Sequence, residues 1–215
     1  MKLIEILKEK KYNTDKHTNH KYIQDFYEKL FEPYMVKKIN FLEIGVLRGE
    51  SLKLWCDYFE DAKKIVGIDI FIRTNEGGGF NDVKRNLSDY DVKLYELNSC
   101  EDTTKHPVEL FTNFKKENSD GFDVLIDDGD HNINAQIKTF KRFSKLMNKG
   151  GLYIIEDIGQ YSSEQTHAKV DKIKSEIQRK PEWWDEEKSI DIKKIETLET
   201  SGGEYGKEIC MAIYF

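Results

Sequence analysis

The chain has 215 residues, of which 34 are basic and 40 acidic, so its formal net charge at neutral pH is −6. A chain of this length favours a single α/β domain. The acidic balance argues against a nucleic-acid partner, because there is no excess of positive charge to neutralise phosphates. Hydrophobic residues make up 38% of the chain, and the 12% of aromatic residues argue against a disordered protein.

The cysteines and the start of the chain indicate the compartment. Cys56, Cys100 and Cys210 are odd in number and form no Cys-x-x-Cys pair, so neither a disulfide framework nor a zinc site is expected. Residues 3–7 predict an amphipathic helix rather than a secretory signal. No apolar run approaches the roughly 18 residues that a membrane span needs. We therefore expect a cytoplasmic protein with no membrane partner.

Short apolar segments rich in β-branched residues alternate along the chain with longer segments of helical periodicity. In chain order, strands are expected at 39–46, 64–70, 92–98, 122–128, 152–156, 191–197 and 208–215. Helices are expected between them at 50–59, 82–87, 108–118, 135–147 and 163–179. This alternation predicts a doubly wound α/β sheet of about seven strands, mostly parallel. The last two strands lie too close for a crossover helix, so they should form an antiparallel hairpin.

The carboxyl end of the first predicted strand carries the pattern Glu43-x-Gly45-x-x-x-Gly49-x-Ser51. Ligands of doubly wound sheets bind beyond such strand ends, where glycines let the backbone approach them closely. A purely structural turn would carry the same glycines, so this motif alone does not distinguish a ligand-binding turn from a structural one. Glu43 lies inside an apolar strand, and its carboxylate needs either a ligand amino group or a backbone turn as partner.

The next two strands end in polar residues that suit a nucleoside. Asp69 follows the glycine turn by about 20 positions, a spacing that lets a carboxylate accept bonds from ribose hydroxyls. Asn98 and Ser99 could bind an adenine edge, although a simple helix cap explains them equally well. The pattern lacks the third glycine of a dinucleotide site. It favours a cofactor with a ribose but no pyrophosphate.

Two acidic clusters end the fourth and fifth strands, Ile126-Asp-Asp-Gly-Asp-His131 and Ile155-Glu-Asp157. In the predicted sheet these ends are neighbours, so their carboxylates gather at one edge. Like charges that close raise one another's pKa unless a cation compensates them. Oxygen ligands without cysteine suit Mg²⁺, Ca²⁺ or Mn²⁺. His131 stands beside them and could take a proton from a substrate hydroxyl.

The ordered set of motifs resembles class I S-adenosylmethionine-dependent methyltransferases, and most closely the metal-dependent sugar O-methyltransferases that act on macrolide and related glycosides. The resemblance covers nearly the whole chain and implies a Rossmann-like fold. It is carried by Asn13-Thr-Asp-Lys16, His20-x-Tyr22, Leu42-Glu-Ile-Gly-Val46, Gly67-Ile-Asp69, Asp127-Asp-Gly-Asp-His131 and Gly150-Gly-x-Tyr-x-Ile-Glu-Asp157.

The resemblance also implies roles for individual residues. Residues 1–36 would form a helical lid over a core of residues 37–215, within one domain of residues 1–215. The catalytic residues would be His131, as general base, and Asp128. The metal ligands, usually for Mg²⁺, would be Asp128, Glu156 and Asp157. The residues implied to bind S-adenosylmethionine are Tyr22, Glu43, Gly45, Gly49, Ser51, Asp69, Asn98, Ser99 and Asp127.

The acceptor implied by the resemblance is a sugar or glycoside, and the chain is compatible with a homo-oligomer. Two departures from the family pattern put the acceptor's identity in doubt: Asn13 replaces a Gly, and Asp130 replaces a Ser. The loop at 77–79 could gate the site or be a plain surface loop.

Three rival functions remain open at this stage. The first is a catechol-type O-methyltransferase, for which Trp183-Trp184 could line a flat acceptor pocket or could equally be packing residues. The second is a non-catalytic domain that binds S-adenosylmethionine. The third is a nicotinamide-dependent oxidoreductase, which the missing Gly-x-Gly-x-x-Gly disfavours.

Overall fold

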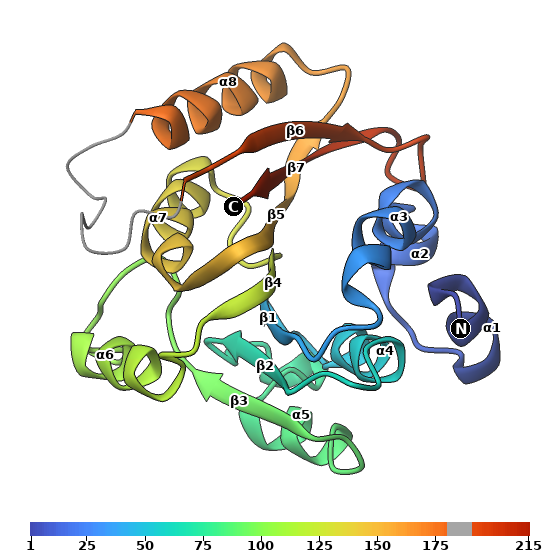
Figure 1. Ribbon diagram of the computed structural model, residues 1–215, viewed down its shortest axis with the longest axis vertical. Helices are drawn as coiled ribbons and strands as arrows, with labels where there is room; N and C mark the ends of the chain where they lie inside the picture. The colour runs from blue at the N-terminus through green and yellow to red at the C-terminus, as the bar shows by residue number, and fades with distance from the viewer. Residues whose placement is uncertain (180–190) are drawn as a thin grey trace.

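The computed structural model describes residues 1–179 and 191–215, which form a seven-stranded sheet with helices on both faces (Figure 1). The strand order is β3-β2-β1-β4-β5-β7-β6. The strands are β1 (Asn40–Ile44), β2 (Lys64–Asp69), β3 (Val92–Glu96), β4 (Phe122–Asp127), β5 (Met147–Gln160), β6 (Lys194–Glu199) and β7 (Glu208–Tyr214). The main helices of the core are α4 (Glu50–Tyr58), α5 (Phe80–Asn86), α6 (Val108–Glu117), α7 (Ile133–Phe143) and α8 (Glu164–Gln178).

The sheet is parallel from β3 to β5, and β7 then pairs antiparallel with both β5 and β6. The chain winds outward from β1 to β3 and then returns to β4 on the other side of β1. The order therefore reverses between β1 and β4, which is where a doubly wound sheet opens a crevice beyond its strand ends. The predicted sheet and its C-terminal antiparallel hairpin are both confirmed.

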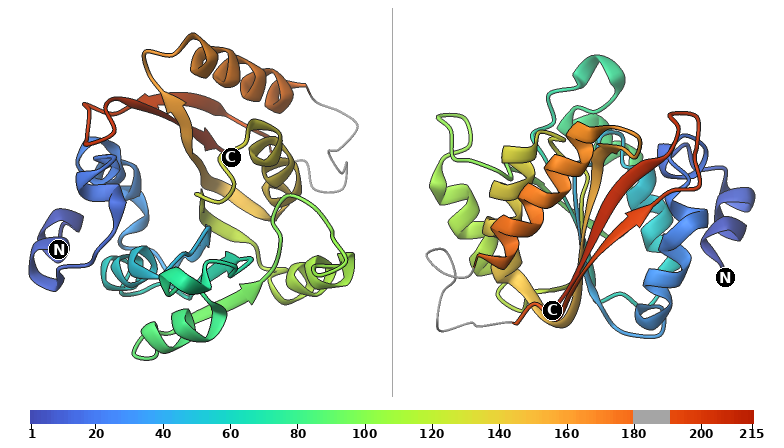
Figure 2. Two further views of the ribbon diagram at one scale, coloured as in Figure 1. Left: turned by 180° about the vertical axis from the view of Figure 1, so that it is seen from behind. Right: turned by 90° about the horizontal axis from the view of Figure 1, so that it is seen from above.

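Apolar residues fill the space on both sides of the sheet. One buried cluster joins the N-terminal helices, α4 and α5 to one face, with Trp55, Phe41 and Phe59 at its centre. The other joins α6, α7 and α8 to the opposite face. The view along the sheet edge in Figure 2 shows α6–α8 on one side and the N-terminal helices with α4 on the other. The two clusters hold the strand ends at fixed positions beneath the site.

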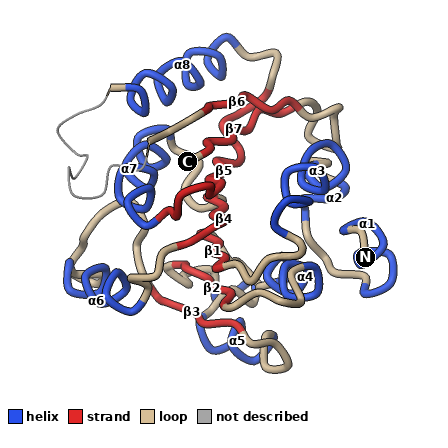
Figure 3. The backbone as a smooth tube through the Cα atoms, in the orientation of Figure 1, coloured by secondary structure: helices blue, strands red, loops and turns tan. Residues whose placement is uncertain are grey.

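The N-terminal part is a chain of short helices that packs against the sheet beside α4 (Figure 3). Its elements are α1 (Leu3–Lys10), α2 (Asp15–Thr18), a π-helix (Ile23–Tyr27), α3 (Glu28–Phe31) and a 3₁₀ turn (Glu32–Tyr34). The aromatic rings of Tyr27 and Phe31 are fully buried against Trp55. This packing brings the segment between α1 and α3 over the carboxyl ends of the central strands.

The element bounds differ from the sequence prediction in a few places. β5 extends from 147 to 160, well beyond the predicted 152–156, although Gly150 has a positive φ of 83°. The predicted helix 135–147 begins at Ile133 and ends at Phe143, followed by a 3₁₀ turn. The predicted strand 191–197 begins at Lys194. Trp183-Trp184 lies outside the described residues.

Within the described part of the chain, none of the helices combines the length and the apolar character that crossing a membrane requires.

Candidate active site

The turn after β1 is locked to the end of β4. Gly45 adopts a left-handed φ of 88°, and its N–H donates to the carbonyl of Ile68 at 2.8 Å. The N–H of Asp128 donates to the carbonyl of Ile44 at 2.9 Å, and the carbonyl of Asp128 closes over Gly45. A glycine is required here because both the backbone angle and the space exclude a side chain. Gly49 begins α4, also with a left-handed φ of 83°.

The buried carboxylate of Glu43 finds its partners inside the protein. Ser51 Oγ donates to one of its oxygens at 2.8 Å, and Trp55 Nε1 donates to the other at 3.2 Å. Burial raises the pKa of Glu43 to about 7, against the opposing effect of Lys16 nearby. The predicted pair Glu43 and Ser51 therefore ties α4 to β1.

A pocket of about 560 Å³ opens beyond the strand ends at the reversal point of the sheet. That volume lies within the range of about 300–1,000 Å³ typical of small-molecule sites. Of the residues predicted from sequence, those that line it are Gly45, Asp69, Asn98, Ser99, Asp128, His131 and Asp157. The other predicted residues do not line it: Tyr22, Glu43, Gly49, Ser51, Asp127 and Glu156.

Asp69 organises the loops at one end of the pocket. One carboxylate oxygen accepts the N–H groups of Val46 and Leu47 at 2.8 and 3.1 Å, and the other accepts that of Phe71 at 2.8 Å. The oxygen that accepts only the Phe71 N–H has a lone pair left, so Asp69 can still accept one bond from a ligand hydroxyl.

Asn98 and Ser99 line the same end of the pocket. The side-chain oxygen of Asn98 accepts the N–H groups of Cys100 and Glu101, which forms a local turn. Ser99 Oγ lies 3.2 Å from Thr139 Oγ1. Within the protein, Asn98 therefore acts as a local cap. Asn98 and Ser99 nevertheless both border the cavity.

The acidic end of the pocket brings together Asp128, His131 and Asp157. His131 Nε2 lies 3.4 Å from Asp128 Oδ1 and 3.5 Å from Asp157 Oδ2. One ligand atom from each of the three residues lies within 4.8 Å of the others, a spacing that a single metal ion can bridge. The two carboxylates are hard oxygen donors of the kind that Mg²⁺ or Mn²⁺ takes, whereas an imidazole is a softer donor. The group thus contains two of the three predicted metal ligands, with His131, the predicted general base, in place of Glu156.

The same carboxylates control the protonation of His131. Asp128 raises the pKa of His131 to about 9, against the effect of burial, and Asp157 adds to the increase. The two carboxylates therefore favour the protonated form of the imidazole.

Asp127 lies next to Asp128 in sequence but is buried behind the pocket. Its carboxylate accepts a bond from the hydroxyl of Tyr153 at 3.4 Å. Burial raises the pKa of Asp127 to about 7. The side chain supports the end of β4 from within the core.

Glu156, the third predicted metal ligand, is held by Lys16 instead of facing the pocket. Lys16 Nζ lies 2.5 Å from Glu156 Oε2 and 2.5 Å from Asp128 Oδ2. The other oxygen of Glu156 accepts a bond from the hydroxyl of Tyr27. The structure thus brings Asp128 and Asp157 together at the pocket, and places Glu156 one layer deeper.

Tyr22 contacts the metal-binding region from the N-terminal segment. Its hydroxyl donates to Asp157 Oδ1 and lies 3.2 Å from Glu208 Oε2. His20 stacks on Tyr22 with ring centroids 4.9 Å apart and hydrogen-bonds Glu208 through Nδ1. Tyr22 therefore orients Asp157 from behind the pocket wall.

Four residues of this region had no role assigned from the sequence: Lys16, His20, Tyr27 and Glu208. Lys16 and His20 belong to the motifs 13–16 and 20–22 that carry the family resemblance, so these motifs could have pointed to both residues as part of the site. Glu208 begins the last strand, and nothing in its local sequence distinguishes it from a surface residue.

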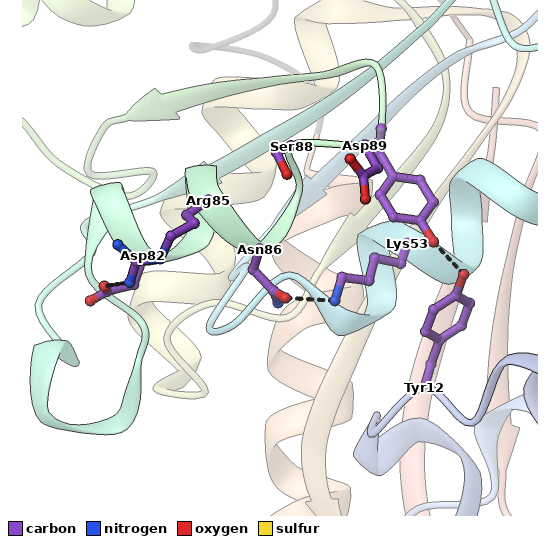
Figure 4. Close-up of a pocket in the computed structure, with 8 residues that line it drawn as sticks. Tyr12, Lys53, Asp82, Arg85, Asn86, Ser88 and Asp89 are labelled. Atoms are coloured by element: carbon purple, nitrogen blue, oxygen red, sulfur yellow. Dashed lines mark hydrogen bonds and ion pairs between the residues drawn. The ribbon is translucent and has the colours of Figure 1, made fainter.

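A second pocket of about 590 Å³ lies between the loop after α1 and the helices α4 and α5 (Figure 4). Three of its charged side chains, Lys53, Asp82 and Arg85, pair with one another or with neighbours. Lys53 binds Glu50 and Asn86, and Arg85 binds Asp82. Among the residues that the structure describes, this second pocket therefore lacks the group of acidic and basic side chains that converges in the first pocket.

Comparison with known proteins gives distant relatives. No protein-family model matches the chain. An uncharacterized protein of Acanthamoeba polyphaga mimivirus is 28% identical over 154 residues, which are 70% of this chain and 66% of that protein. The 8-demethyl-8-(2-methoxy-alpha-L-rhamnosyl)-tetracenomycin-C 3'-O-methyltransferase of Streptomyces olivaceus is 27% identical over 139 residues, 61% of this chain and 31% of that enzyme.

A solved structure extends the likeness over the whole fold. The MycE methyltransferase of the mycinamycin biosynthetic pathway, in complex with Mg, S-adenosylhomocysteine and mycinamycin VI, matches 99% of this chain and 54% of its own, with a TM-score of 0.66 and 19% identity. The chain thus spans about a third of the tetracenomycin enzyme and about half of MycE. The comparisons confirm the resemblance to S-adenosylmethionine-dependent sugar O-methyltransferases and the Rossmann-like fold.

Proposed function

We propose that this protein is an S-adenosylmethionine-dependent O-methyltransferase that methylates a hydroxyl of a sugar or glycoside, assisted by a divalent metal ion. The observation that carries the proposal is the composition of one pocket. A glycine turn and polar strand ends that suit a nucleoside share a cavity of about 560 Å³ with Asp128, His131 and Asp157. Methyl transfer needs these two halves side by side, because the donor methyl and the acceptor oxygen must meet in line.

The nucleoside half of the pocket would hold the cofactor. The turn from Gly45 to Gly49 would admit the methionine end, and the ordered carboxylate of Asp69 would accept the ribose hydroxyls. Asn98 and Ser99 border the place expected for the adenine. Glu43 and Ser51 act from behind by fixing α4, whose first turn faces the cofactor.

The acidic half of the pocket would hold the metal and the acceptor. Asp128 and Asp157 are the proposed ligands that line the cavity, and Glu156 is the proposed third ligand one layer deeper. A divalent cation bound here would supply positive charge that lowers the pKa of a hydroxyl beside it. His131 Nε2 stands on the cavity wall beside both carboxylates, where it can accept the proton of an acceptor hydroxyl. The half-exposed side chain of His131 can pass that proton to solvent.

The sugar acceptor is the most specific part of the proposal. It is supported by the 3'-O-methyltransferase activity of the tetracenomycin relative and by the mycinamycin VI bound in the MycE structure. The catechol-type alternative draws on Trp183-Trp184, which the described residues do not include. The chain's partial coverage of its relatives makes the acceptor the point to test first.

The decisive experiment supplies methyl-labelled S-adenosylmethionine and Mg²⁺ with two acceptor panels, one of deoxysugar glycosides and nucleotide sugars and one of catechols. We expect label on a sugar hydroxyl, located by mass spectrometry. Label on catechols alone would replace the sugar assignment with the catechol alternative. S-adenosylhomocysteine binding without turnover on either panel would favour a non-catalytic binding domain.

A further inference from the structure

Lys16 is the most deeply buried cation of the site. It is 1% exposed, and its ammonium lies 2.5 Å from Asp128 Oδ2, 2.5 Å from Glu156 Oε2 and 4.0 Å from Glu43 Oε1. The ammonium is thus enclosed by the carboxylates of three acidic residues.

Lys16 engages one oxygen on each of two proposed metal ligands. Asp128 and Glu156 were both predicted as metal ligands, and each gives one oxygen to the ammonium. The second oxygen of Glu156 is engaged by the hydroxyl of Tyr27. By contrast, Asp128 Oδ1 and Asp157 Oδ2 face His131 at the pocket. A divalent ion can reach those two oxygens from the cavity, but it can reach Glu156 only if Lys16 leaves.

We propose that Lys16 is an exchangeable internal cation that neutralises Asp128 and Glu156 in the metal-free protein and is displaced from Glu156 when the metal binds. This inference rests on the proposed function, because the metal ion is part of that proposal. Two cations that share the same carboxylates repel one another, and releasing Lys16 also frees Glu156 to complete the ligand set.

The position of Lys16 in the chain makes such an exchange feasible. Lys16 is carried by α2, a four-residue helix between two irregular segments, whereas Asp128 and Glu156 are fixed by the central strands. A small shift of α2 moves the ammonium without disturbing the sheet. Metal binding would thereby loosen the segment that lies over the strand ends.

The first test measures Mn²⁺ affinity by calorimetry in the absence of cofactor and acceptor. We expect Lys16→Met to bind Mn²⁺ at least about tenfold more tightly than the wild type, because the competing charge is gone. Lys16→Arg, which retains the charge, should stay near the wild-type affinity. Lys64→Met removes a lysine that pairs with Asp120 outside the site, and should leave the affinity unchanged. Equal or weaker binding by Lys16→Met would overturn the proposal.

A second test uses the wild-type protein and does not depend on how the variants fold. Brief acetylation followed by peptide mass spectrometry reports the accessibility of each lysine. Lys16 should be protected without metal and become labelled several-fold faster in saturating Mn²⁺, while Lys64 labels equally in both conditions. Continued protection of Lys16 at saturating Mn²⁺ would overturn the exchange while leaving the metal assignment intact. Failure of wild type and variants alike to bind Mn²⁺ would overturn the metal assignment together with the exchange.

Discussion

The backbone of Gly45 lies directly against the carbonyl oxygen of Asp128, so close that a Cβ at position 45 would be 1.9 Å from that oxygen. Two neighbouring strand ends therefore meet without any side chain between them. One end belongs to the proposed cofactor turn and the other to the proposed metal site. The separation of the two halves of the pocket is set by this backbone contact.

Gly45→Ala should lower both stability and cofactor affinity. The new methyl group must push the β1 and β4 ends apart and must also tolerate a left-handed φ, which together cost on the order of 1–3 kcal/mol. Thermal unfolding and S-adenosylhomocysteine titration measure the two effects. Gly77→Ala is the matched control, because Gly77 has a φ of 76° but no atom within 4 Å of its added Cβ. Equal losses in both variants would mean that backbone angle alone, and not the contact with Asp128, explains the effect.

His131→Ala should reduce kcat by about 10²–10⁴-fold, the usual contribution of a general base. S-adenosylhomocysteine binding should persist, since the turn after β1 and Asp69 are unaffected. The comparison variant is His167→Ala, which removes a histidine of α8 that contacts Tyr161. A wild-type kcat in His131→Ala would remove the histidine from the proposed mechanism.

Asp157→Asn should weaken Mn²⁺ binding by about tenfold or more, because it removes one charged ligand oxygen. Asparagine is the suitable replacement because it tolerates the left-handed φ of 51° at this position. Calorimetry gives the affinity, and chelator titration of activity gives the metal requirement. Asp130→Asn removes a nearby charge on the pocket wall and should weaken Mn²⁺ binding much less. An equal effect would mean that Asp157 acts only through its charge and is not a metal ligand.

Asp120→Asn should destabilise the fold in a pH-dependent way. Burial would raise the pKa of Asp120, but hydrogen bonds from Lys63 and Lys64 outweigh it and hold the pKa well below its usual range. An acid whose folded pKa is depressed stabilises the fold above its unfolded pKa, and this contribution is lost as the pH falls. Because Asp120 is partly exposed, the difference at pH 7 should be modest, about 0.2–1 kcal/mol.

Urea unfolding of the wild type and Asp120→Asn at pH 7, 5 and 3 checks this expectation. The stability difference should stay constant down to the pKa of the unfolded aspartate and begin to shrink at pH 3, vanishing only when the pH falls through the depressed folded pKa. A difference that stays constant across this pH range would point to lost hydrogen bonds from Asn40 rather than to charge.

The sheet was predictable from sequence because its signal is local. Apolar runs near Phe41, Val66 and Leu125 each identify a buried strand, and helical periodicity identifies the crossovers between them. The extension of β5 beyond 152–156 was not predictable, because its first residues include Lys149 and two glycines. Pairing with neighbouring strands overrides that local preference.

The site was predictable to the extent that it consists of strand ends. Asp69, Asp128, His131 and Asp157 follow recognisable strands, and topology alone brings them to one edge. The partners of Glu43 and Glu156 were not predictable. Ser51 and Trp55 reach Glu43 through helix packing, and Lys16 reaches Glu156 across 140 positions of sequence. Such contacts depend on tertiary structure that no local pattern encodes.

The bond between His20 and Glu208 joins residues 188 positions apart, which has a consequence for how the protein folds. During synthesis the N-terminal helices leave the ribosome well before β7, the strand that anchors them at this edge. Closing so long a loop is slow compared with forming the local helices and strands. The carboxylates at the strand ends therefore gather before the N-terminal segment is anchored over them. In a growing chain these carboxylates are exposed to cations in solution, and the site is complete only once β7 has docked.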